Sequence, residues 1–112
     1  MCGICGVVGL AAREPSEPLR RRAAASLHLL RHRGPDEVHL APCGPGAIGA
    51  TRLAIRGLDS GSQPIVDPAT GVVVACNGEI DNHRELRAWL EGRGHVITRE
   101  TDIAVIPGPE VR

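Results

Sequence analysis

The sequence contains no lysine, phenylalanine or tyrosine, and Trp89 is its only tryptophan. A hydrophobic core must therefore be built from Val, Ile, Leu and Ala. The 13 basic residues, all of them arginine, are balanced by 13 acidic residues, so the formal net charge is zero. This balance argues against a nucleic-acid-binding protein, which would carry an excess of basic residues.

Long hydrophobic runs are also missing. No stretch approaches the roughly 18 consecutive apolar residues of a membrane span. The first apolar run, residues 4–12, has no basic segment ahead of it, so no signal peptide is predicted. Without an export signal, the four cysteines are expected to be reduced thiols, metal ligands or a nucleophile rather than disulfides. We therefore expect a cytoplasmic protein, and 112 residues allow one domain at most.

Apolar periodicity and turn residues divide the chain into two helices and several short strands. Residues 16–31 are expected to form a helix that Ser16 can cap, and Asn82 is expected to cap a second helix. The buried side of the second helix is predicted to consist of Leu86, Trp89 and Leu90. The expected strands are residues 2–9, 37–41, 46–55, 64–66, 71–76 and 95–98. Because these strands arrive mainly as hairpins, the predicted fold class is α+β with antiparallel sheets.

Cys2 is the first candidate for chemistry. Methionine is usually removed when the next residue is small, and this processing would leave Cys2 at the N-terminus. A terminal cysteine offers a thiol nucleophile and a free α-amine, which can take the thiol proton directly or through a water. On spacing alone, a cysteine at this position also fits a small residue that enters a strand.

The same segment fits two alternative patterns. Cys2 and Cys5 form a C-x-x-C, and His28 and His32 form an H-x-x-x-H, which together imitate a zinc-binding set. The gap between the two pairs is longer than the roughly 12–15 residues typical of such sites. A thioredoxin-like redox motif would open a helix after a strand, whereas this C-x-x-C stands at the start of the chain. No metal site is assigned, and a small zinc or redox module is kept as an alternative.

Further candidates are polar residues next to apolar segments. Asn77-Gly78 is a common hairpin turn, but here it leads towards a helix, and its amide and backbone N–H could together bind an oxyanion. Arg52 lies in an apolar strand, where an arginine is commonly just outward-facing. Its planar guanidinium can also bind a carboxylate through two hydrogen bonds. Asp102, taken alone, is a surface acid.

Six segments of the chain carry a family resemblance when they are taken in order. They are MCGICGVVG at 1–9, RHRGPD at 31–36, TRLAI at 51–55, SQP at 62–64, NGEIDNHRELR at 77–87 and TD at 101–102. In this order they resemble the glutaminase domain of class II glutamine amidotransferases, most closely its asparagine synthetase branch. The resemblance covers nearly the whole chain.

The resemblance implies an N-terminal-nucleophile (Ntn) hydrolase, an αββα sandwich in which two antiparallel sheets pack between helix layers. It implies that Cys2 attacks the side-chain amide of glutamine and that its freed α-amine acts as the general base. The Asn77 side chain and the Gly78 N–H would hold the tetrahedral oxyanion. Ammonia would leave, and water would then release glutamate from a thioester on Cys2.

The resemblance also implies a glutamine-binding pocket. Arg52 would bind the α-carboxylate of the substrate, and Asp102 would pair with its α-ammonium. Ile55 and Glu79 would line the pocket, together with Asn77 and Gly78. No cofactor is expected in this domain. ATP and Mg²⁺ would belong to a synthetase domain or chain that receives the ammonia, and neither a nucleic acid nor a membrane is an expected partner.

The sequence departs from the family pattern in two places. Asp81 stands where the family usually has an aromatic residue, and residues 103–106 stand where it usually continues into a Glu-containing helix. We therefore expect residues 1–106 to be an incomplete glutamine amidotransferase domain, without the C-terminal part of the sandwich, and residues 107–112 to be an irregular tail. The alternative function is a catalytically inactive fragment, or an interaction module that needs a partner chain to fold.

Overall fold

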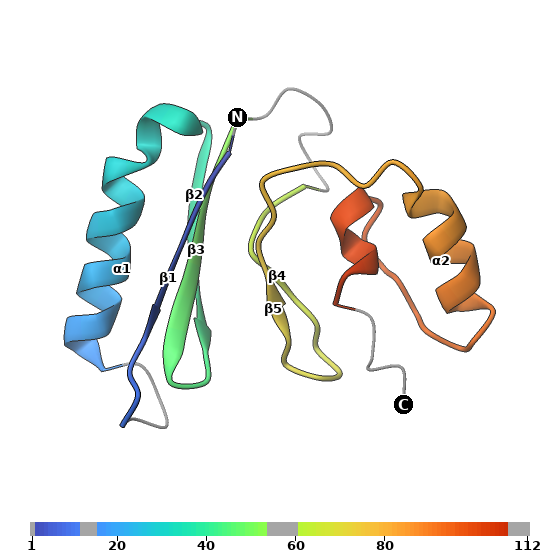
Figure 1. Ribbon diagram of the computed structural model, residues 1–112, viewed down its shortest axis with the longest axis horizontal. Helices are drawn as coiled ribbons and strands as arrows, with labels where there is room; N and C mark the ends of the chain where they lie inside the picture. Colours follow the sequence, from blue (N-terminus) through green and yellow to red (C-terminus); the bar gives the residue numbers. More distant parts are fainter. Residues whose placement is uncertain (1, 12–15, 54–60, 108–112) are drawn as a thin grey trace.

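The computed structural model describes residues 2–11, 16–53 and 61–107 (Figure 1). In chain order the elements are β1 (Gly3–Val8), α1 (Glu17–Leu29), the 3-10 helix η1 (Arg31–Arg33), β2 (Glu37–Cys43), β3 (Gly46–Arg52), β4 (Ile65–Val66), β5 (Val73–Val74), α2 (His83–Glu91) and the 3-10 helix η2 (Asp102–Val105). All sheet pairings between these strands are antiparallel. The predicted α+β class with antiparallel sheets is confirmed.

The first sheet has the strand order β1-β3-β2, so the central strand is the last of the three in sequence. Helix α1 covers one face of this sheet, and its Ala23 and Leu27 are buried there. Close packing requires small residues beneath the helix, since a Cβ at Gly49 of β3 would lie 2.5 Å from a methyl group of Leu27. In a core without aromatic rings, glycine and alanine on the strands let the helix approach the sheet closely.

The second sheet is the short hairpin of β4 and β5. The Asp67 carboxylate closes its turn by accepting hydrogen bonds from the backbone N–H groups of Ala69 and Thr70, at 3.3 and 3.2 Å, and from the Thr70 hydroxyl. The hydroxyl contact, followed by the backbone contacts, lowers the pKa of Asp67. A second hydrophobic core lies beside this hairpin and consists of Ile65, Ile103 and Ala104, with Cys76, Ile80 and Ile97 packed against it.

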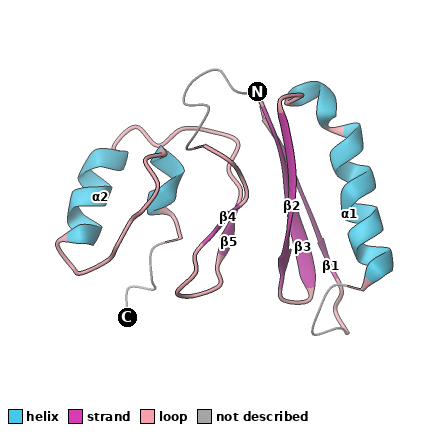
Figure 2. Ribbon diagram, turned by 180° about the vertical axis from the view of Figure 1, so that it is seen from behind, coloured by secondary structure: helices cyan, strands magenta, loops and turns pink. Residues whose placement is uncertain are grey.

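The elements follow one another across the molecule in layers. Figure 1 shows α1, then the three-stranded sheet, then the β4–β5 hairpin, and finally η2 and α2, and the view from behind in Figure 2 shows the same order. None of the described helices is long and apolar enough to cross a membrane.

Two local predictions are wrong. Residues 95–98 form no strand, and the carbonyl of Ile97 in this segment accepts a hydrogen bond from Nη1 of Arg87 at 3.1 Å. Trp89 is not buried with the core side of α2, since 42% of it is exposed and Arg93 lies over its ring, 3.7 Å from the ring centre. Leu90 is the one buried residue of α2, so the apolar side of this helix is narrower than its sequence suggests.

The remaining boundaries are close to expectation. Ser16 and Asn82 stand at the N-caps of α1 and α2, although neither side chain makes a capping hydrogen bond. The hairpin strands β4 and β5 are shorter than predicted, and β3 ends at Arg52.

Candidate active site

Cys2 lies just before β1, and its backbone is held in place on both sides. Its carbonyl accepts a hydrogen bond from Nε of Arg33 at 3.1 Å. The N–H of the next residue, Gly3, donates to Oγ1 of Thr51 at 3.1 Å, and the buried Thr51 hydroxyl donates in turn to the Leu30 carbonyl at 3.3 Å. A side chain at position 3 would collide with this arrangement, because its Cβ would lie 2.8 Å from Oγ1 of Thr51. The half-buried Cys2 is thus anchored to the ends of α1 and β3.

Strand register brings Arg52 to the same end of the first sheet. Gly3 pairs with Thr51 on one side of β3, and Glu37 pairs with Arg52 on the other. Continuing the β1 register by one residue sets Cys2 opposite Arg52. Residues directly opposite one another in a sheet point to the same face, so Arg52 and Glu37 share the face away from α1. The alternation of β1, extended by one residue, predicts the same face for Cys2. The arginine is not outward-facing: its side chain is 10% exposed.

Asn77, Gly78 and Glu79 form an exposed segment between β5 and α2. Asp102 is brought to this segment from the far end of the chain. Its Oδ2 accepts a hydrogen bond from the backbone N–H of Ile80 at 2.7 Å, and its Oδ1 accepts one from the Thr101 hydroxyl at 3.2 Å. The carboxylate therefore binds the end of the segment that carries the predicted oxyanion donors.

The segment Gly61–Gln63 links these two groups of residues. The Ser62 hydroxyl donates to Oε2 of Glu37 at 3.0 Å, and Oε1 of Gln63 accepts the N–H of Cys76 at 2.7 Å. One short segment therefore contacts the residue opposite Arg52 and the residue before Asn77. In Figure 1 the start of β1, the end of β3 and the segment after β5 lie at the same end of the molecule.

Comparison with known proteins then decides the family. A family model described as "Glutamine amidotransferase domain" matches residues 1–107. The chain belongs to the glutamine amidotransferase domain family. The match spans the described elements from β1 to η2, so both groups of candidate site residues lie within it.

Curated relatives of this amidotransferase domain are glutamine-hydrolysing asparagine synthetases. The protein from Brassica oleracea is 40% identical over 95% of this chain, and asparagine synthetase 1 of Arabidopsis thaliana is 39% identical over 95%. A nodule asparagine synthetase of Pisum sativum is 38% identical over the same share. The chain spans only 17–18% of the length of these relatives.

Within the amidotransferase domain, sequence reasoning overlooked the residues that support the candidate site. Glu37, Ser62 and Gln63 were not singled out individually, although each makes a side-chain hydrogen bond to the site's framework. Ser62 and Gln63 belong to the SQP segment at 62–64, which is part of the family resemblance, and this segment could have pointed to them. Ile55, predicted to line the pocket, lies outside the described residues.

The alternative zinc site finds no support among the residues that the structure describes. Within the described ranges, no group of three or more His, Cys, Asp or Glu side chains could hold a metal ion. Cys5 lies on the α1 side of β1, where its thiol donates to the carbonyl of Ala23 at 3.7 Å. Burial raises the pKa of Cys5, and a weaker backbone contact from Gly49 opposes this rise. Strand alternation extended from β1 to residue 2 predicts that Cys2 faces away from Cys5.

Proposed function

We propose that this chain is the glutamine-hydrolysing part of an asparagine synthetase-like amidotransferase, with Cys2 as its nucleophile. The observation that carries the proposal is the strand register, which supports a position for Cys2 beside Arg52 at one end of the first sheet. The guanidinium can bind the carboxylate of a small molecule while the nucleophile attacks an amide of the same molecule.

The chemistry begins once Met1 is removed. The α-amine of Cys2 accepts the thiol proton, and the sulfur attacks the side-chain amide carbon of glutamine to form a tetrahedral oxyanion. The side-chain amide of Asn77 and the N–H of Gly78 donate hydrogen bonds to this oxyanion. The amine returns its proton to the leaving nitrogen, and the C–N bond breaks to give ammonia and a γ-glutamyl thioester. Water then adds to the thioester, which releases glutamate and restores the thiol.

The substrate is recognised by its charged backbone end. Arg52 binds the α-carboxylate, and Asp102 binds the α-ammonium while it retains its hydrogen bond from Ile80. Glu79 lines the pocket. Both charges of the substrate are thus matched by groups of opposite sign, which distinguishes free glutamine from a glutamine side chain within a protein.

The wider assignment follows the relatives. The layer order supports an Ntn-hydrolase sandwich, of which residues 1–106 form part. The ammonia serves an ATP- and Mg²⁺-dependent synthetase region that amidates an acid such as aspartate, as the names of the relatives suggest. The glutaminase reaction itself uses no cofactor.

Ammonia release from glutamine tests the proposal. The untagged chain, with Met1 removed, should produce equal amounts of ammonia and glutamate, and Cys2→Ala should abolish both. Cys43→Ala is the matched control, because Cys43 lies at the opposite end of β2 from Glu37 and should be dispensable. Ammonia release that survives in Cys2→Ala, or a processed chain that releases none, would contradict the proposal.

A further inference from the structure

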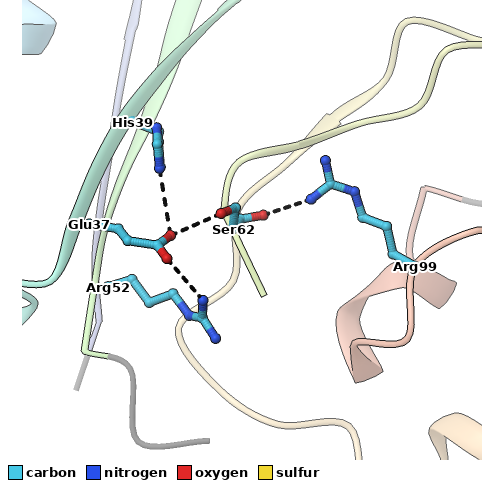
Figure 3. Close-up of polar contacts among 5 residues, drawn as sticks. All are labelled: Glu37, His39, Arg52, Ser62 and Arg99. Carbon is cyan, nitrogen blue, oxygen red and sulfur yellow. Dashed lines mark hydrogen bonds and ion pairs between the residues drawn. The ribbon is translucent and has the colours of Figure 1, made fainter. Parts of the chain in front are cut away.

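The guanidinium of Arg52 is enclosed by groups from two separate parts of the chain. Nη1 of Arg52 lies 3.3 Å from Oε1 of Glu37, and the exposed fractions of the two side chains are 10% and 21% (Figure 3). Gly61 lies so close to the guanidinium that a Cβ at this position would overlap Nη2 of Arg52. A charge this deeply buried needs an opposite charge beside it, because an uncompensated buried charge is strongly destabilising.

The Glu37 carboxylate is itself held in place. Its Oε2 accepts a hydrogen bond from the Ser62 hydroxyl at 3.0 Å and lies 3.6 Å from Nε2 of His39. The carbonyl of Ser62 accepts a hydrogen bond from Nη1 of Arg99 at 3.0 Å. Figure 3 shows Glu37 and Arg52 side by side on the first sheet, with Ser62 and Arg99 approaching from the other half of the molecule. Both oxygens of Glu37 are thus engaged, one of them with Arg52.

We propose that Glu37 is a positioning residue that fixes the guanidinium of Arg52 for the substrate carboxylate. The inference rests on the proposed function, since it assigns Glu37 to the glutamine-binding arginine. A guanidinium has five N–H donors, so it can bind a carboxylate of the protein and one of the substrate at the same time. Glu37 contacts the guanidinium through a single oxygen, which determines its orientation without the two-bond arrangement that a substrate carboxylate prefers.

Glu37 could instead compete with the substrate for Arg52, and this role predicts a different result. If the Glu37 carboxylate competed with glutamine for Arg52, its removal would tighten glutamine binding. If Glu37 positions the guanidinium, its removal weakens binding, because a displaced donor loses its alignment with the substrate. The direction of the change therefore separates the two roles.

The first test does not involve glutamine. In the ¹⁵N-labelled chain the Nη1–H group of Arg52, which donates to Oε1 of Glu37, should exchange slowly with solvent and give a rigid heteronuclear NOE. In Glu37→Ala its exchange should become at least about tenfold faster, with a smaller increase in the shape-conserving Glu37→Gln. The control is Glu17→Gln, which removes an exposed ion pair of the same 3.3 Å length between Glu17 and Arg21. An Arg52 signal that is equally protected in all three variants would overturn the proposal, whether or not the chain is a glutaminase.

The second test measures ligand binding through protection of Cys2 from a diazo-ketone analogue of glutamine. L-Glutamine and its α-amide, which lacks the carboxylate, are compared as protecting ligands. Glu37→Gln and Glu37→Ala should weaken protection by glutamine about tenfold or more and leave protection by the α-amide nearly unchanged. Glu17→Gln should change the protection by neither ligand.

An equal loss of protection for both ligands would mean that Glu37 only supports the fold, and tighter glutamine binding would mean that it competes with substrate. Absence of any Cys2 adduct in the unmodified chain would count against the proposed function, and the exchange measurement would still decide the role of Glu37.

Discussion

Glu37 and Arg52 face each other across β2 and β3, and Oε1 of the carboxylate lies 3.3 Å from Nη1 of the guanidinium. The pair holds the proposed glutamine-binding arginine in the largely buried end of a sheet. Its position next to the continuation of β1 makes it part of the candidate active site rather than an isolated structural contact.

Replacement of Arg52 by alanine should affect stability as well as glutamine binding. The change leaves the Glu37 carboxylate without its buried partner, and we expect a loss of about 2–3 kcal/mol in the free energy of unfolding. Arg21→Ala, which breaks the exposed pair with Glu17, should cost no more than about 0.5 kcal/mol. Urea denaturation of both variants measures the difference, and equal stability losses would refute it.

Asp102 accepts a hydrogen bond in the fold and is proposed to bind the substrate ammonium, and different substitutions separate these two roles. Asp102→Asn keeps an oxygen that can accept the Ile80 N–H but removes the charge that pairs with the substrate ammonium. We expect KM for glutamine to rise about tenfold while the melting temperature stays nearly constant. Asp102→Ala also loses the hydrogen bond and should lower the free energy of unfolding by about 1–2 kcal/mol. If both variants lose stability equally, the carboxylate charge itself stabilises the fold.

The loop Gly34-Pro35-Asp36 packs closely against β3. A Cβ at Gly34 would lie 2.5 Å from the backbone nitrogen of Arg52, with no flexible side chain to move aside. Gly34→Ala should therefore destabilise the fold by about 1–3 kcal/mol. Gly6→Ala is the matched control, since the nearest atom to its Cβ would be 3.9 Å away. Thermal melts of the two variants should differ clearly, and a Gly34→Ala chain as stable as Gly6→Ala would contradict the close packing.

Cys5 should be a poor nucleophile. Because burial raises its pKa, less thiolate is present at a given pH, and its alkylation by iodoacetamide should be slower than that of free cysteine. The pH profile of alkylation should move to higher values. By linkage, the contribution of Cys5 to stability is complete below the pKa of the unfolded chain and is lost as pH rises through the folded-state pKa. Peptide mapping across pH 7–10 measures the rate, and labelling as fast as that of free cysteine would exclude this environment.

Local patterns predicted the parts of the fold that depend on neighbouring residues. The β2–β3 hairpin follows from two apolar segments around a Pro- and Gly-containing turn, and α1 follows from its helical spacing. Trp89 was misplaced because only the tertiary fold shows that Leu90 is the one buried residue of α2. Residues 95–98 were misplaced as a strand, and Arg87, a side chain from another element, binds the carbonyl of Ile97.

The candidate site was predicted by resemblance rather than by spacing. No local rule connects Asp102 with Ile80, or Ser62 with Glu37, since these contacts span 22 and 25 residues. Glu37 was overlooked for the same reason: its significance depends on a partner on the neighbouring strand and on a loop that follows later in the chain. The structure thus adds Glu37, Ser62 and Gln63 as residues that support the predicted site, while the chemical roles of the predicted site residues are proposals.

Covalent labelling tests the central claim most directly. The untagged chain is incubated with the diazo-ketone analogue of glutamine, and its intact mass and digested peptides are measured. We predict a single adduct on Cys2, with Met1 absent and with labelling suppressed by excess glutamine. An adduct that forms regardless of glutamine, or labelling spread over Cys5, Cys43 and Cys76, would contradict the claim that Cys2 is the nucleophile of an assembled glutamine site.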